Sequence, residues 1–193
     1  MNTSRLIGFL RSVNDMPLHK AEEIATHFSE MEIPRHAFLL HEGRICDTWL
    51  FLENGFMRGF AHNGDGEEVT TGFHSPGVPV FEVSSFFHRV RSKENIQALT
   101  DCNGWYLSFE QLNGLFHSMP EFREFGRAIL VRGYTGLKSR MLEAITETAE
   151  ARYANFLQSN PEIFQHASLK SIASFLGITD TSLSRIRKEF AKK

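Results

Sequence analysis

The C-terminal stretch SLKSIASFLGITDTSLSRIRKEF, residues 168–190, contains two short helical patterns on either side of a glycine. The apolar residues of the first pattern recur at helical spacing, at Leu169, Ile172, Ala173 and Leu176. Gly177 permits the left-handed turn that ends a helix, and Thr179 can cap the next one. The second helix would bury a face formed by Leu183, Ile186 and Phe190.

Two short helices joined by a glycine turn form the helix-turn-helix pattern. The small Ala173 allows the two helices to cross closely, and the space between them would be filled by Ile178, Leu183 and Ile186. Polar side chains would face outward from the second helix, namely Thr181, Ser182, Ser184, Arg185 and Lys188. Any two packed helices could share this spacing, but the small residue, the glycine and the polar face together favour DNA binding.

Charge is distributed unevenly along the 193 residues, whose net charge is -2. From residue 168 onward, six Lys and Arg residues stand against two acidic residues, whereas the preceding part has 15 against 21. Only the C-terminal part is therefore suited to a polyanion. A basic helix end also complements the helix dipole, so the charge alone leaves both interpretations open.

The composition argues against several other classes of protein. Hydrophobic residues make up 41% and charged residues 23%, which is ordinary globular usage. No uncharged apolar run approaches the ~18 residues of a membrane-spanning helix, and we recognise no secretion signal, so we expect a cytoplasmic protein. Cys46 and Cys102 lie far apart in the sequence and outside any CxxC pair. We therefore expect buried thiols rather than a disulfide or a zinc site.

Residues 33–107 alternate short strand patterns with turn residues, which predicts a small antiparallel β-sandwich or β-roll. Within it, Asn54-Gly55 and Asn103-Gly104 are interpreted as hairpin turns. Helical spacing returns at Ser108, where SFEQ has the form of a helix capping box.

Pro120 opens a long helical segment. Apolar residues recur along it in steps of four and three, the spacing of a coiled-coil seam, at Leu130, Tyr134, Leu137, Met141 and Ala144. The segment also contains three glycines, Gly126, Gly133 and Gly136. Glycine has a low helix propensity, and a close approach of another helix would offset this cost. We favour a dimerisation helix, and burial of the seam against the chain's own roll is the alternative.

The order of these parts resembles the Crp-Fnr family of bacterial transcription regulators, relatives of the catabolite activator protein. The most specific pieces are IASFLGITDTSLSRIRKEF and HEGRICDTWLFLENGFMRGF, and the resemblance covers nearly the whole chain. It implies an α+β fold with a cyclic-nucleotide-binding-like antiparallel β-roll (1–117), a long dimerisation helix (118–147) and a C-terminal helix-turn-helix DNA-binding domain (148–193). ITDTSLSRIRKEF looks like a branch common in Bacteroidetes, which lacks the β-hairpin wing after the second helix.

The resemblance implies a homodimer that binds an inverted repeat in double-stranded DNA, with the second helix in the major groove. Arg185 matches the family arginine that reads guanine, and Thr181 and Ser182 are the next candidates for base or phosphate contacts. Phosphate contacts are assigned to Lys188, Lys170, Arg187 and Lys192. RNA polymerase and an unidentified small-molecule effector are further candidate partners.

Cyclic-nucleotide binders of this family have a Gly-Glu pair, whose glutamate binds the ribose hydroxyl, and an Arg-Ser or Arg-Thr pair, whose arginine binds the cyclic phosphate. Aligned without a gap, PGVPVFEVSSFFHRVRSKENIQAL places Phe81 and Glu82 at the first pair and Ser92 and Lys93 at the second. Phe81 obstructs the close backbone approach that glycine allows, and lysine lacks the guanidinium fork. We expect no ordinary cAMP binding; the alternative is a cyclic-nucleotide-responsive regulator using Glu82 and Lys93.

No cofactor or metal is expected. Iron-sulfur sensing needs about four clustered cysteines, and the chain has two. A metal enzyme of the cupin type is a remote alternative, because a β-roll is similar in shape to a cupin barrel. The sequence lacks the HxH followed by Glu that such barrels use, so we expect a protein that is not an enzyme.

Overall fold

The structure, a computed structural model, describes residues 2–190. The N-terminal helices are α1 (Ser4–Ser12) and α2 (Leu18–Ala25). The central part consists of β1 (Ser29–Ile33), β2 (Phe38–Leu40), β3 (Thr48–Asn54), β4 (Met57–His62), β5 (Glu68–His74), β6 (Pro79–Val80), α3 (Val83–His88), β7 (Asn95–Ala98) and β8 (Cys102–Ser108). The helices that follow are α4 (Phe109–Ser118), α5 (Pro120–Thr146), α6 (Ala149–Ser159), α7 (Ile163–His166), α8 (Leu169–Leu176) and α9 (Asp180–Phe190).

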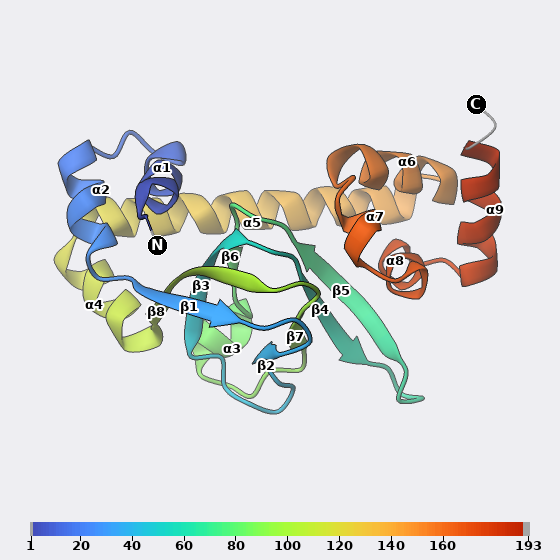
Figure 1. Cartoon of the computed structure of the whole chain (residues 1–193), viewed down its shortest axis with the longest axis horizontal. Helices are drawn as coiled ribbons and strands as arrows, with labels where there is room; N and C mark the ends of the chain where they lie inside the picture. Colours follow the sequence, from blue (N-terminus) through green and yellow to red (C-terminus); the bar gives the residue numbers. More distant parts are fainter. Residues whose placement is uncertain (1, 191–193) are drawn as a thin grey trace.

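The strands form two antiparallel sheets, with the orders β1-β8-β3-β6 and β2-β7-β4-β5. They lie in the middle of the molecule, and α5 runs past them from the N-terminal helices to the C-terminal helices (Figure 1). The N-terminal helices and α4 lie at one end of α5, and α6 to α9 lie at the other. The predicted α+β fold with an antiparallel β-roll and a long helix is confirmed.

Both predicted hairpin turns are wrong: the first pair is a corner between two sheets, and the second lies inside a strand. β3 and β4 belong to different sheets, so Asn54-Gly55 forms a corner between them. Gly55 has a φ of +93°, and a Cβ there would lie 2.5 Å from the carbonyl oxygen of Asp101 in the neighbouring corner. Asn103 and Gly104 lie inside β8, where a Cβ on the glycine would collide with the Phe51 carbonyl. Glycine at 104 allows two strands to approach closely and makes no turn.

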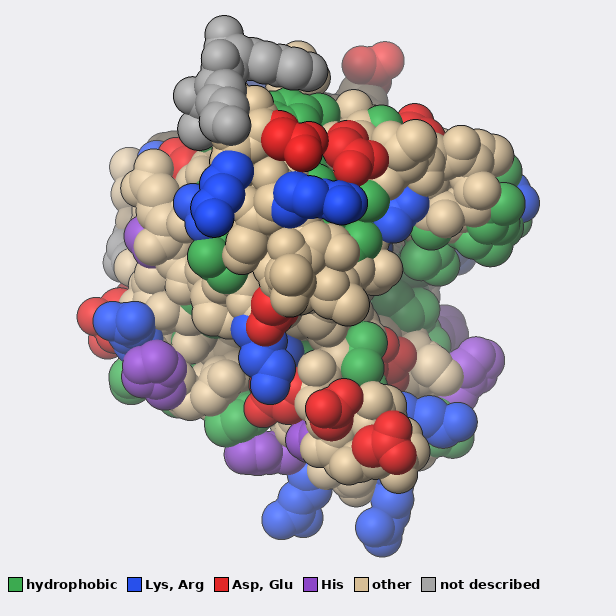
Figure 2. Space-filling model, turned by 90° about the vertical axis from the view of Figure 1, so that its right-hand side faces the viewer, with side chains coloured by type: hydrophobic (Ala, Val, Ile, Leu, Met, Phe, Trp, Pro, Cys, Tyr) green, Lys and Arg blue, Asp and Glu red, His purple; other side chains and the backbone are tan. Residues whose placement is uncertain are grey.

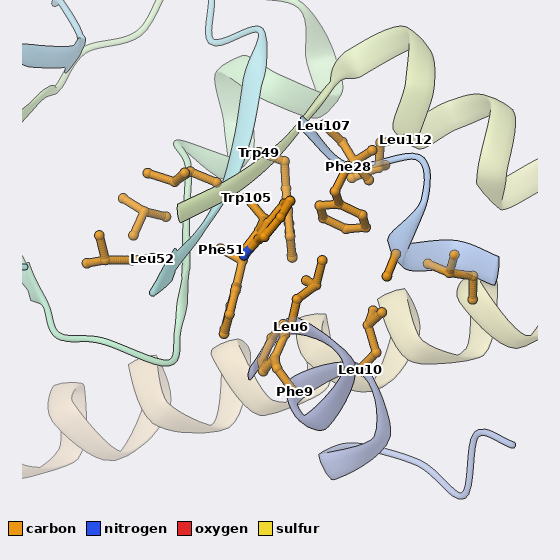
Figure 3. Close-up of a cluster of buried hydrophobic side chains, with 14 of the residues drawn as sticks. Leu6, Phe9, Leu10, Phe28, Trp49, Phe51, Leu52, Trp105, Leu107 and Leu112 are labelled. Atoms are coloured by element: carbon orange, nitrogen blue, oxygen red, sulfur yellow. The ribbon is translucent and has the colours of Figure 1, made fainter. Parts of the chain in front are cut away.

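The main hydrophobic core joins α1, the roll and α5. Side chains of α1 point toward the aromatic residues of β3 and β8, as Figure 3 shows for Leu6, Phe9, Trp49, Phe51 and Trp105. Phe9 stacks on Phe51, with ring centroids 4.6 Å apart. Its edge also meets the ring of Phe125 on α5, at 5.4 Å. One aromatic residue of α1 therefore connects the sheet to the long helix.

The start of the helical half follows the sequence signals. Ser108 and Gln111 form the predicted capping box: the Ser108 Oγ accepts from the Gln111 N–H at 3.2 Å, and the Gln111 Oε1 accepts from the Ser108 N–H at 2.8 Å. Pro120 lies in the first turn of α5, where a missing N–H costs nothing. A Cβ at Gly126 would lie 2.5 Å from the Phe116 ring of α4, so this glycine does allow close helix approach. Gly133 and Gly136 have no such neighbour among residues 2–190.

A second hydrophobic core holds α6 to α9 together. Its buried members from these helices are Tyr153, Phe156, Ile163, Ile172, Ala173, Leu176, Leu183 and Ile186. Phe56, from the corner between β3 and β4, is also buried in this core, and its ring stacks on that of His166 with centroids 4.6 Å apart. The C-terminal helices therefore have their own core and also pack against the roll.

We predict that Phe125→Ala will lower the free energy of unfolding by ~3–5 kcal/mol, because it removes a ring that is 1% exposed from the junction of α1 and α5. Urea unfolding at a fixed protein concentration measures the change. Leu18→Ala on α2 is the control, since that side chain is 49% exposed. Equal stability of the two variants would contradict the assignment of Phe125 to the main core.

Candidate functional site

The helices α8 and α9 pack around a glycine turn. Gly177 has the left-handed conformation, with a φ of +67°, and its N–H donates to the carbonyls of Ala173 and Ser174. The Ile178 N–H also donates to the Ala173 carbonyl, at 3.0 Å. These bonds satisfy carbonyls at the end of α8 and turn the chain sharply into α9. The sequence signal at Gly177 therefore identified the turn correctly.

The start of α9 is capped as the sequence indicates. The Thr179 Oγ1 accepts a hydrogen bond from the Ser182 N–H at 3.2 Å and donates to the Ser182 hydroxyl at 3.0 Å. Asp180 in the first turn complements the positive end of the helix dipole. Leu183 and Ile186 are buried against α8, and Ala173 is fully buried at the crossing. The packed faces of both helices are thus those that the spacing predicts, except that Leu169 at the start of α8 is 40% exposed.

The opposite face of α9 is exposed. Thr181, Arg185 and Lys188 lie about one helical turn apart along one side and are all exposed. For Arg185 and Lys188 the structure shows no ion pair or side-chain hydrogen bond with a residue in the range 2–190. Both cations are therefore available to an external partner.

The remaining residues assigned to DNA are placed less uniformly. Ser182 is half-buried, and its hydroxyl takes part in the cap of α9. Arg187 is exposed, but it is two residues from Arg185, so it projects from a different side of α9. Lys170 is exposed near the start of α8, and Lys192 lies outside the described residues. Viewed toward α9, the surface carries Lys and Arg side chains beside Asp and Glu side chains (Figure 2).

The four residues assigned to the effector pocket make separate contacts within the chain and do not share one set of partners. The Glu82 carboxylate caps the short helix α3, accepting from the N–H groups of Ser84 at 3.0 Å and Ser85 at 2.6 Å. The Phe81 ring packs beside Trp49, at a centroid distance of 6.2 Å, and it also contacts Phe86 and Phe87.

The other two residues also differ from the expected arrangement. Ser92 is buried, and its hydroxyl donates to the Glu94 carbonyl at 2.8 Å and accepts from the Glu94 N–H at 3.0 Å. Lys93 is exposed. The seryl hydroxyl is therefore used within its own turn.

Two arginines, Arg89 and Arg91, lie close in sequence to Ser92 and Lys93, where cyclic-nucleotide binders have a phosphate-binding arginine. Arg89 donates to the Asp47 carboxylate at 2.6 Å and to the Cys46 carbonyl at 2.9 Å. Its guanidinium also lies 4.2 Å from the ring centroid of Phe109. Arg91 is exposed and pairs through its backbone with Ile45. The Arg89 guanidinium is thus already bound by the chain itself, and the Arg91 side chain is exposed.

Sequence reasoning missed Glu94, which lies close to this site. Burial raises the pKa of its carboxyl group, and the negative charge of Glu82 raises the pKa further. The Thr71 hydroxyl donates to the Glu94 Oε2 at 3.1 Å. Only the strand pairing places Glu94 beside Thr71, so no local pattern could have identified it.

The apolar seam of α5 is open on the surface. The exposed fractions are 41% for Leu130, 70% for Tyr134, 64% for Leu137 and 47% for Met141. Large apolar side chains that recur on one side of a helix at such exposure are typical of an interaction surface. The alternative interpretation, burial of this seam against the chain's own roll, is wrong.

A hollow of about 650 Å³ lies between α5, α6 and α8. The guanidinium groups of Arg140 and Arg152 line it, together with aromatic rings. Both groups are bound by the chain itself, because Arg140 donates to the Thr71 carbonyl and Arg152 donates to the carbonyls of Glu147 and Leu176. The hollow therefore offers an anion little that the protein has not already used.

Within residues 2–190, no group of three or more His, Cys, Asp or Glu side chains is placed to hold a metal ion. No helix in that range is both long enough and apolar enough to cross a bilayer. Cys46 and Cys102 are buried free thiols, as expected, and burial raises the pKa of both.

Comparison with known proteins agrees with this architecture. Residues 30–119 match the family model of the cyclic nucleotide-binding domain. No protein of curated function matches the sequence.

Solved structures similar to this chain include the c-di-GMP-responsive global regulator CLP of Xanthomonas campestris, with 17% identity, a TM-score of 0.69, and coverage of 91% of this chain and 92% of that one. FixK2 from Bradyrhizobium japonicum has 17% identity and a TM-score of 0.72, and the match covers 86% of this chain and 85% of FixK2. The Thermus thermophilus catabolite activator protein has 18% identity and a TM-score of 0.58, and the match covers 95% of this chain and 87% of that protein. Identities this low show a shared fold, and the neighbours are regulatory proteins. The resemblance to the Crp-Fnr family is thereby confirmed: residues 30–119 are a cyclic nucleotide-binding domain, and the chain has the fold of Crp-Fnr-type regulators.

Proposed function

We propose that this protein is a dimeric transcription regulator in which α8 and α9 form a helix-turn-helix that binds double-stranded DNA. The observation that carries the proposal is the exposed face of α9, on which Thr181, Arg185 and Lys188 project from a helix whose other side is buried against α8. Such a helix fits the major groove, where an arginine recognises guanine through O6 and N7. Lys170 and Arg187, together with Lys192 outside the described residues, would contact phosphates.

The exposed seam of α5 supports a homodimer. A parallel pair of α5 helices would bury the exposed apolar side chains and place two copies of α9 at the same end of the molecule. A two-fold dimer recognises an inverted repeat with half-sites about one helical turn apart. We keep the division into an effector domain (1–117), a dimerisation helix (118–147) and a DNA-binding domain (148–193); the separate hydrophobic core that α6 to α9 share supports the last of these.

The roll would respond to an effector other than cAMP bound in the usual way. This part of the proposal rests on the exposed Lys93 and on Arg89, whose guanidinium is already held by the Asp47 carboxylate. The family match over residues 30–119 favours the second candidate, a cyclic-nucleotide-responsive regulator that uses Glu82 and Lys93. RNA polymerase remains a candidate partner of either regulator.

The proposal is tested by selecting random duplex DNA on the full-length protein at a stated salt concentration, with and without cAMP. Enrichment of an inverted repeat supports a dimeric DNA-binding regulator. Dependence of that enrichment on cAMP would favour the second candidate. A pool that stays random under both conditions would contradict the proposal.

Arg185→Ala is predicted to weaken binding to the selected repeat by ~1–3 kcal/mol and to relax the preference at one base pair, because it removes a bidentate contact with guanine. Lys188→Ala is predicted to weaken binding to all DNA sequences alike and to reduce the slope of log K against log salt concentration by about 1, because it removes a phosphate contact. Fluorescence anisotropy over a salt series separates the two effects. Arg123→Ala, an exposed cation far from α9, is the control. Identical, sequence-independent losses in both variants would refute the assigned roles.

Leu137→Lys is predicted to dissociate the dimer at micromolar concentration, because it places two charges opposite each other in the α5 seam. Sedimentation velocity gives the association state. Lys138→Ala, next along the helix but outside the seam, is the control and should remain a dimer. A Leu137→Lys protein that sediments as the wild type does would contradict dimerisation through α5.

Isothermal titration with cAMP and with cGMP is predicted to give no saturable heat, since the exposed Lys93 stands where cyclic-nucleotide binders have an arginine and Arg89 is already held by Asp47. Saturable binding that disappears in Lys93→Ala would show instead that the lysine substitutes for that arginine.

A further inference from the structure

The strand β5 contains a bulge at the edge of its sheet. Gly59 of β4 pairs with Gly72, and Phe60 pairs with Thr70, so Thr71 has no partner residue on β4. A bulge leaves the extra residue outside the ladder and redirects the strand. β5 is also the last strand of its sheet, so its outer edge has backbone groups that no other strand among residues 2–190 pairs.

Two helices bind the backbone at this bulge. The Thr70 N–H donates to the Ser174 Oγ of α8 at 2.9 Å. Both terminal nitrogens of the Arg140 guanidinium, on α5, donate to the Thr71 carbonyl oxygen at 3.2 Å. One N–H and one C=O of the roll are thus satisfied by side chains from two different helices.

Arg140 reaches α8 as well. Its guanidinium carbon lies 4.3 Å from the ring centroid of Phe175, which is a cation–π contact. Phe175 also contacts Phe73 of β5, with centroids 5.2 Å apart, and Phe156 of α6, with centroids 4.8 Å apart. A single side chain therefore touches the long helix's two neighbours, the roll and α8.

The same bulge residue is linked to the interior of the roll. The Thr71 hydroxyl donates to Glu94, whereas its carbonyl accepts from Arg140. A movement of Thr71 would therefore change the contacts of a buried carboxylate and of the helix pair together.

We propose that Arg140 is a positioning residue for DNA recognition, which fixes α8, and with it α9, in one orientation relative to α5. The inference rests on the proposed function. In a dimer joined along α5, the orientation of each α8 relative to its own α5 sets the separation of the two α9 helices. Arg140 thereby selects the half-site spacing that the dimer accepts, without touching DNA itself.

The experiment measures how the full-length protein tolerates altered spacing. The selected inverted repeat is compared with duplexes whose central spacer is one base pair longer or shorter. Arg140→Ala should weaken binding to the selected spacing by about tenfold, the effect of losing one charge-assisted hydrogen bond. Binding to the altered spacings should change little, so the spacing preference flattens. Arg140→Lys should be intermediate, because an ammonium can bind the Thr71 carbonyl but lacks a planar face for Phe175.

A second variant tests the contact independently of Arg140. Ser174→Ala removes the acceptor of the Thr70 N–H and should flatten the spacing preference in the same direction. Hydrogen exchange of the Thr70 amide should become faster in Ser174→Ala and in Arg140→Ala, a readout that requires no DNA. Arg132→Ala, an exposed arginine on the same helix, is the matched control and should change neither quantity.

The outcomes separate this inference from the proposed function. Wild-type spacing preference in both Arg140→Ala and Ser174→Ala would overturn the positioning role and leave DNA binding intact. An equal loss at every spacing, together with a lower melting temperature, would assign Arg140 to stability alone and would also overturn it. If the wild-type protein selects no repeat at all, the proposed function fails, and the positioning role fails with it.

Discussion

The attachment of α5 to the roll is the constraint on which the rest of the structure depends. Phe122 and Phe125 lie in the first turns of α5 and are buried in the main core, where Phe125 meets Phe9 and the two α5 rings stack at 5.6 Å. Beyond this point α5 leaves the core and becomes exposed. A helix held firmly at one end and continuous in its hydrogen bonding transmits that orientation to the C-terminal helices, which contact the roll again through Phe56 and Phe73.

Local signals predicted the helical half well, because each depends on residues only a few positions apart. The capping box at Ser108, the start of α5 at Pro120, the turn at Gly177 and the cap at Thr179 are all present as expected. The polar face of α9 and the placement of the apolar seam on one side of α5 also follow directly from helical periodicity, whereas the exposure of that seam comes from the structure. Apart from that exposure, these features need no knowledge of the tertiary structure.

The strand half was harder to predict because its glycines serve long-range contacts. Asn54-Gly55 and Asn103-Gly104 have the composition of tight turns, yet one is a corner between sheets and the other lies within a strand, near its start. Residues far apart in the sequence decide the difference: Asp101 crowds Gly55, and Phe51 crowds Gly104. The same limitation hid Glu94 and Arg140, whose roles depend on the register between β4 and β5 and on the docking of α8.

The covering of β5 by α8 also bears on solubility. An uncovered edge strand can pair with the edge of another chain, which is a route to aggregation. Here the Ser174 hydroxyl accepts the hydrogen bond of the Thr70 N–H. The bulge at Thr71 also makes the strand a poor template for regular pairing with another strand. A conformer in which the C-terminal helices moved away from β5 would lose the hydrogen bond between Ser174 and Thr70 but would keep the bulge. The bulge would therefore still hinder pairing of β5 with another chain when α8 no longer covers the strand.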